Sequence, residues 1–147
     1  MNINRILCPL DFSESSRKVL ESAVFLTSTY HAQLQLLHVV DHLHGFDNYQ
    51  ILVLTPQEIA ERMEKNADEN LSELLGHVKE PINIEKVIKH GKASVKIIEA
   101  ASETKTDLIV MGSHGRSGLS HALVGSVAEA VARHAPCTVL IVRDAGQ

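Results

Sequence analysis

Hydrophobic and polar residues follow two patterns that alternate along the chain, one typical of strands and one typical of helices. Short apolar runs occur at Ile3–Cys8, Gln33–Val40, Asp107–Met111 and Thr138–Val142. Such runs, when turn residues bound them, are typical of strands that are buried on both faces. Ile82–Ile88 alternates apolar and charged residues imperfectly, which indicates a further strand near an edge of the sheet. The pattern therefore predicts five strands.

The segments between these strands carry apolar residues at the spacing of a helix. Ser13–Tyr30, Ala93–Thr104 and Ser126–His134 each show this period. Asp11 or Ser13 can cap the first of these helices by accepting hydrogen bonds from its free backbone N–H groups. In the helix Ala93–Thr104, the residues expected to point inward are Val95, Ile98 and Ala101.

A fourth helix has the clearest start in the sequence. Thr55 can cap it, Pro56 suits the first helical position, and Glu58 can reach back to complete a capping box. The helix is expected to stop near Gly76–Pro81. Its apolar stripe consists of Ile59, Met63, Ala67, Leu71, Leu74, Leu75 and Val78.

Strands alternate with helices through the whole chain, which is typical of an α/β fold. We expect a single doubly wound five-stranded parallel sheet, in the order 3-2-1-4-5, with helices on both faces. The 147 residues suit one domain over residues 1–147. A ligand of such a sheet binds where the strand order reverses, here between the loops Pro9–Ser13 and Gly112–Ser126. His42–Leu54 is predicted to be an irregular excursion.

The composition narrows the classes of function. Hydrophobic residues make up 44%, charged residues 22%, and the net charge is −4. A negative chain of this kind is not expected to bind nucleic acid or a membrane surface. No apolar run is long enough for a membrane span or a leader peptide, so a cytoplasmic location is expected. Cys8 and Cys137 lie in apolar stretches and are expected to be buried, reduced thiols.

Glycines crowd the segment between the fourth strand and the last helix, at Gly112, Gly115, Gly118 and Gly125. A glycine-rich loop before a helix lets backbone N–H groups converge on a phosphate. Ser126 stands three residues before a glutamate, which is the spacing of a capping box. Ser126 is therefore either a plain cap or a cap that also contacts phosphate. The spacing fits neither the P-loop nor the dinucleotide fingerprint.

The arrangement Gly112-x-x-Gly115, nine residues, then Gly125-Ser126 resembles the nucleotide-binding signature of the universal stress protein family. The segments "ILCPLDFSESS", "LLHVVD" and "DLIVMGSHGRSGL" are also similar to that family's blocks, in the same order. The resemblance implies the branch that binds ATP or a related adenine nucleotide (ADP or AMP), with Mg²⁺ carried on the phosphates as an option.

The same resemblance assigns the contacts by position. Four residues are implied beside the ribose and the adenine, the last two through their backbone: Pro9, Asp11, Val39 and Val40. Two are implied on the floor of the pocket, Met111 and Gly112. The residues implied around the phosphates are Gly115, Gly125, Ser126 and Val127.

Two further side chains of the glycine-rich loop, Arg116 and His114, are each open to two interpretations. Arg116 could pair with phosphate oxygens through two hydrogen bonds, or be a plain solvated cation. His114 is expected to face solvent rather than to act as a general base. His38, His42 and His44 show no recognised zinc spacing, so no metal site of the protein's own is expected.

Three functions remain open. The leading one is an ATP-binding sensor or regulator with an unidentified protein partner. It would form a homodimer through Thr138–Val142, as the resemblance implies and as an exposed apolar edge strand would favour. The second is a slow ATPase or phosphotransferase that phosphorylates its own loop at Ser117 or Ser120; the loop has no lysine or carboxylate for fast transfer. The third is a nucleotide-independent scaffold.

Overall fold

Five parallel strands form the centre of the computed structural model, which describes residues 1–41, 54–114 and 124–143. The strands are β1 Arg5–Pro9, β2 Gln33–Val40, β3 Asn83–His90, β4 Leu108–Gly112 and β5 Thr138–Val142. They lie in the order β3-β2-β1-β4-β5, and every neighbouring pair is parallel. The predicted class and strand order are confirmed.

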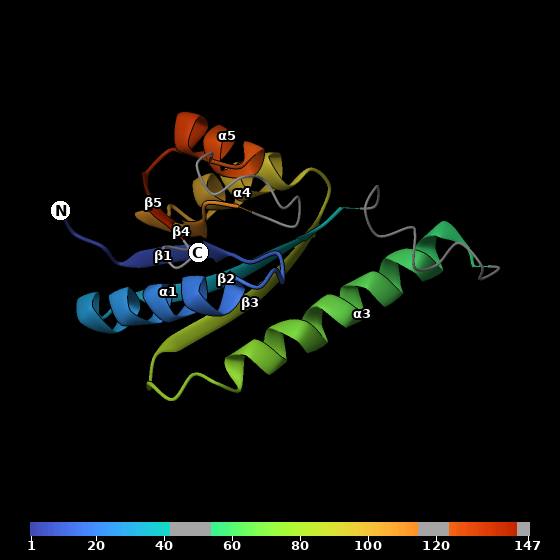
Figure 1. The fold of residues 1–147 in the computed structure, drawn as a ribbon, viewed down its shortest axis with the longest axis horizontal. Coiled ribbons are helices and arrows are strands. Elements are labelled where there is room, and N and C mark those ends of the chain that lie inside the picture. Colours follow the sequence, from blue (N-terminus) through green and yellow to red (C-terminus); the bar gives the residue numbers. More distant parts are fainter. Residues whose placement is uncertain (42–53, 115–123, 144–147) are drawn as a thin grey trace.

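Helices cover both faces of this sheet. They are α1 Ser16–Tyr30, α3 Pro56–Leu75, α4 Ala93–Glu103 and α5 Ser126–His134. Figure 1 shows α1 and α3 below the sheet and α4 and α5 above it. This layering follows from the strand order, because the chain moves outward from β1 in one direction through α1 and α3 and in the other direction through α5.

Two hydrophobic cores result, one on each face of the sheet. Successive residues of a strand point to opposite faces, so Leu36 joins the core beneath α1 and α3, whereas Leu37 joins the core beneath α4 and α5. The same division separates Val110 from Ile109 on β4. Burial on both faces explains why Leu36, Leu37 and Leu108–Met111 are apolar, whereas Gln33 and Gln35 lie at the less buried start of β2.

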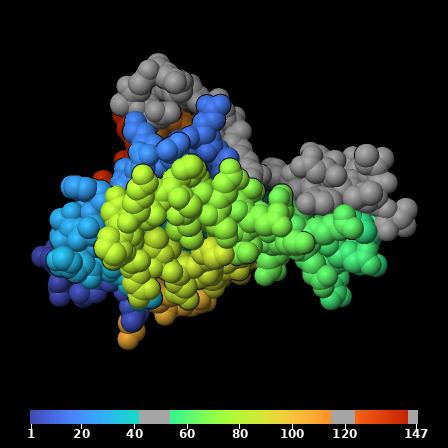
Figure 2. Space-filling view, turned by 90° about the horizontal axis from the view of Figure 1, so that it is seen from below, coloured from blue at the N-terminus to red at the C-terminus, as the bar shows by residue number. Residues whose placement is uncertain are grey.

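The start of α3 agrees with the sequence. The Thr55 hydroxyl accepts a hydrogen bond from the Glu58 N–H at 3.2 Å, and the Glu58 carboxylate accepts one from the Thr55 N–H at 3.3 Å. Farther along, Lys86 of β3 donates to Asp68 at 2.8 Å and to Ser72 at 3.0 Å. These contacts hold the C-terminal half of α3 on β3, while its N-terminal half projects beyond the sheet (Figures 1 and 2).

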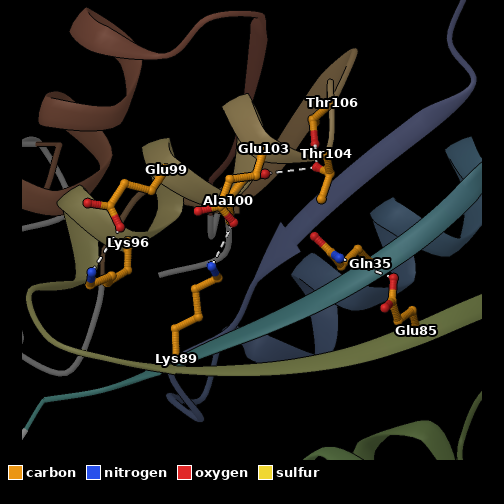
Figure 3. Close-up of polar contacts among 9 residues, drawn as sticks. All are labelled: Gln35, Glu85, Lys89, Lys96, Glu99, Ala100, Glu103, Thr104 and Thr106. Atoms are coloured by element: carbon orange, nitrogen blue, oxygen red, sulfur yellow. Dashed lines mark hydrogen bonds and ion pairs between the residues drawn. The ribbon is translucent and has the colours of Figure 1, made fainter.

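Polar contacts surround α4 on the other face (Figure 3). Lys89 of β3 pairs with Glu103 of α4 at 2.9 Å. Thr104, which ends the helix, donates from its hydroxyl to the Ala100 carbonyl at 2.8 Å. Beside them, Gln35 of β2 donates to Glu85 of β3 at 3.1 Å. Of these three contacts, the ion pair between Lys89 and Glu103 is the one that joins α4 to the sheet.

Three local predictions need correction. Val95 does not point inward, because its side chain is 43% exposed; the buried residues of α4 are Ser94, Ile97, Ala100 and Ala101. The helix α1 begins at Ser16 rather than Ser13, because Ser13–Ser15 form a turn with a bond from the Ser16 N–H to the Ser13 carbonyl. Cys137 is half-buried, whereas Cys8 is fully buried; both are free thiols.

Candidate functional site

The strand order reverses at β1, which pairs with β2 on one side and with β4 on the other. The helix that follows β1 covers one face of the sheet, and the helix that follows β4 covers the opposite face (Figure 1). The connections therefore diverge at the carboxyl ends of these two strands, which is where a doubly wound sheet is expected to form a ligand-binding crevice. Pro9 ends β1 and Gly112 ends β4 at this crevice.

Asp11 shapes the turn between β1 and α1. Its Oδ1 atom accepts hydrogen bonds from the Ser13 N–H at 3.0 Å and from the Ser16 hydroxyl at 3.3 Å. The N-cap of α1 is Ser15, and no side chain caps this helix. Neither Asp11 nor Ser13 is thus the cap that the sequence predicted. The Asp11 carboxylate instead closes the turn that carries it.

Gly112 brings the end of β4 close to the first turns of α1. A Cβ atom added there would lie 3.4 Å from Val19 Cγ2 and 3.5 Å from Ser15 Oγ. Its neighbour Met111 is buried in the core beneath α4 and α5. Met111 can therefore face a ligand only through its backbone, and a side chain at Gly112 would lie against Val19 and Ser15.

Ser113 joins three segments at the base of the glycine-rich loop. Its N–H donates to the Val142 carbonyl of β5 at 3.1 Å, and its carbonyl accepts from the Gly125 N–H at 2.7 Å. Its hydroxyl lies 2.9 Å from Nδ1 of His114. His114 is half-buried, whereas the sequence predicted that it would face solvent. The start of α5 is thus fixed beside the ends of β4 and β5.

The first turn of α5 presents backbone donors. Gly125 is the N-cap and Ser126 is the first helical residue, so the predicted role of Ser126 as a cap is wrong. The first intrahelical bond runs from the Glu129 N–H to the Gly125 carbonyl at 2.9 Å. The N–H groups of Ser126, Val127 and Ala128 precede that bond, so they point out of the end of the helix. An anion is favoured there.

The carboxyl end of β2 completes the crevice on the side of β1. Val39 is half-buried, and Val40 is buried. The Val40 carbonyl accepts from the N–H of Gly91 at 2.9 Å, so this carbonyl already serves the turn after β3. A base contacting this strand end would use other backbone groups or the apolar surface of Val39.

Some predicted residues lie outside the described part of the chain. Gly115 and Arg116 belong to residues 115–123, and His42 and His44 belong to residues 42–53, where the irregular excursion was predicted. Among the described residues, no group of His, Cys, Asp and Glu side chains could hold a metal ion. None of the described helices has both the length and the apolar character to cross a membrane.

Sequence reasoning missed His38 and Phe12, whose rings lie 4.3 Å apart between centroids. From the sequence, the only role considered for His38 is that of a metal ligand. The available signal was its position on β2, where it shares a face with Leu34 and Leu36 by the two-residue period of a strand. Two surface depressions lie along α3, and their lining residues are Leu54, Glu58, Glu61, Arg62, Lys65, Asn66 and Glu69. They include none of the predicted site residues.

The fold and this crevice define a doubly wound α/β protein with a glycine-rich segment at its topological switch point. The model of the universal stress protein family matches residues 2–143, and the chain belongs to that family. One relative is the universal stress protein A homolog 2 of Coxiella burnetii. It is 33% identical over 149 residues, which cover 99% of this chain and 98% of the relative.

Solved structures share the fold. Protein MJ0577 of Methanocaldococcus jannaschii has a TM-score of 0.85 at 24% identity, with 100% of both chains covered. A universal stress protein in complex with cAMP has a TM-score of 0.64 at 24% identity, covering 97% of this chain and 98% of its own. The Archaeoglobus fulgidus universal stress protein in complex with dAMP has a TM-score of 0.68 at 21% identity, covering 97% of this chain and 100% of its own.

Proposed function

We propose that this protein binds an adenine nucleotide, ATP foremost, at the carboxyl ends of β1 and β4, and that it acts as a dimeric sensor or regulator. The observation that carries the proposal is the start of α5. There the N–H groups of Ser126 and Val127 precede the first intrahelical bond, and the bond from Gly125 to Ser113 fixes them beside the switch point. Phosphate is the ligand such donors suit.

The remaining contacts of the proposed pocket come from the resemblance to the family's nucleotide-binding signature. The ribose and base lie between Pro9 and Asp11 on one side and the backbone of Val39 and Val40 on the other. In the proposed pocket the phosphates extend over Gly112 toward α5, and Gly115, Arg116 and His114 are the further residues that the sequence assigns to them. Two proteins of the same fold were solved with cAMP and dAMP, so adenine nucleotides are the first ligands to test. Mg²⁺ would come with the phosphates.

The first test is calorimetry of the native protein with ATP, ADP and AMP, at 1:1 stoichiometry per chain. Gly125→Val is expected to weaken ATP binding at least about tenfold, which is about 1.4 kcal/mol. The backbone at Gly125 has φ −65° and ψ 159°, which valine adopts without strain. The loss would therefore come from a branched side chain where phosphate approaches.

Gly76→Ala is the matched control, because Gly76 ends α3 away from the crevice and also has a negative φ of −59°. It should leave ATP affinity unchanged. No heat with any of the three nucleotides, or equal ATP affinity in Gly125→Val and the wild type, would refute the proposed pocket. Release of inorganic phosphate in the same samples would show whether the bound ATP is also hydrolysed.

A further inference from the structure

A buried histidine holds the segment that follows β1. His38 is 8% exposed, and its Nδ1 atom lies 2.7 Å from the Leu10 carbonyl oxygen. A carbonyl oxygen can only accept a hydrogen bond, so Nδ1 carries the proton and donates it. Leu10 is itself buried. Without His38, its carbonyl would lose this partner inside the protein, which is costly.

The same ring also contacts Phe12. The two ring centroids are 4.3 Å apart, and the planes are tilted by 31°. Phe12 has φ 62°, a left-handed conformation that an L-residue other than glycine, asparagine or aspartate rarely adopts. Its ring therefore needs a compensating contact in the native state, and the imidazole of His38 provides one. One side chain thus fixes both the backbone at Leu10 and the ring at Phe12.

The residues that His38 holds alternate with residues of the proposed nucleotide pocket. Pro9 and Asp11 flank Leu10, and Val39 and Val40 follow His38 directly on β2. The two segments are also joined by the bond from the Leu10 N–H to the Leu37 carbonyl at 2.8 Å. His38 thus determines how the segment Pro9–Phe12 sits against the carboxyl end of β2.

We infer that His38 is a positioning residue of this pocket: through Leu10 and Phe12 it sets the spacing between the Asp11 turn and Val39–Val40, and so the affinity for the nucleotide, without touching the ligand. This inference rests on the proposed function for its effect on affinity. The part of the inference that concerns the Asp11 turn applies to the protein without ligand and can be tested there.

Two substitutions separate the two contacts of the ring. His38→Asn keeps an N–H donor close to the position of Nδ1 but removes the ring. His38→Phe keeps a ring for Phe12 but removes the donor. Ile6→Val is the control, because it removes one methylene from a buried residue on the same strand as Pro9, at the end of the sheet away from the crevice.

Two measurements are made on each full-length variant. Calorimetric titration with ATP gives the affinity, and hydrogen–deuterium exchange without nucleotide gives the protection of the Ser13 amide, which Asp11 holds in the native turn. His38→Phe is expected to weaken ATP binding about tenfold, the size of a lost hydrogen bond to a buried group, and to speed exchange at Ser13. His38→Asn should recover most of the affinity, and Ile6→Val should lower only the melting temperature.

The outcomes separate this inference from the proposed function. The inference is overturned if His38→Phe binds ATP with wild-type affinity. It is also overturned if His38→Phe and Ile6→Val have equal melting temperatures and lose equal ATP affinity. If the wild-type protein binds none of ATP, ADP and AMP, the proposed function fails. Exchange then decides the inference alone: faster exchange at Ser13 in His38→Phe, but not in Ile6→Val, supports it, and unchanged exchange overturns it.

Discussion

At the scale of single residues, the two thiols differ because of their surroundings. Burial raises the pKa of the Cys8 thiol far above its ordinary range. Burial, and to a smaller extent the nearby charge of Asp107, raise the pKa of Cys137. A hydrogen bond with the backbone of Ile109 lowers this pKa by less than the other two raise it. Because the thiolate is the reactive form, neither residue is expected to react as fast as a free cysteine.

A thiol-labelling experiment checks this difference. In the native protein, Cys137 should react with a disulfide reagent more slowly than free cysteine at the same pH, and Cys8 should react only when the protein is unfolded by denaturant. The Cys137→Ala variant should therefore show no native labelling. Fast native labelling of that variant would contradict the complete burial of Cys8.

The Cys8 pKa also has a consequence for stability at alkaline pH. An unfolded chain loses the Cys8 proton above about pH 8.5, whereas the folded protein keeps it. The unfolded state then binds fewer protons, so the contribution of this group to stability falls as pH rises. Between about pH 8 and pH 10, the free energy of unfolding should therefore decline less steeply in Cys8→Ala than in the wild type. Parallel declines in urea titrations would exclude the effect.

The residues of the crevice show where sequence reasoning reached its limit. Gly112 and Gly125 were identified by spacing, and the structure gives each a definite local role. Ser126 was assigned as a cap because serine is a common cap and the capping-box spacing was present. Gly125 holds that position instead, since its N–H is bound to the Ser113 carbonyl. Such a contact joins two segments and has no local signature in the sequence.

At the scale of elements, α3 is the clearest case for a stability measurement. Replacing the cap in Thr55→Ala removes the acceptor for the Glu58 N–H, and it is expected to lower the free energy of unfolding by about 1 kcal/mol. Thr55→Ser keeps the hydroxyl and should cost much less. Urea denaturation measures both, and equal losses in the two variants would mean that the cap bond contributes nothing.

The sheet was predictable from the sequence because burial on both faces leaves short apolar runs, as in β4. The inward face of α4 was not. Its apolar residues allow two neighbouring stripes that share Ala101: the predicted one also contains Val95 and Ile98, and the other contains Ile97 and Ala100. Packing on the sheet selects the second, with Ser94 buried as well. Helical periodicity alone fixes the existence of such a helix but not its rotation.

At the scale of the whole molecule, β5 is an edge of the sheet, and Leu140 on it is 41% exposed. An apolar edge strand of this kind favours pairing with a second copy. If the proposed dimer forms there, Leu140→Glu should convert it to a monomer in analytical ultracentrifugation. Val95→Glu, at a similarly exposed apolar residue of α4, should leave the dimer intact. A dimer that survives Leu140→Glu and dissociates in Val95→Glu would place the interface on α4.

The position of β1 at the centre of the sheet has a consequence for how the chain is made. One edge of β1 receives β2 early in synthesis, but the other receives β4, and the carboxylate of Asp107 binds the Asn4 N–H across 103 residues of sequence. Until the ribosome has released β4, that edge of the nascent strand has no partner and its apolar face is open to other chains. β1 is therefore expected to complete its pairing late in synthesis, and until then it is the strand that gains most from shielding by a chaperone.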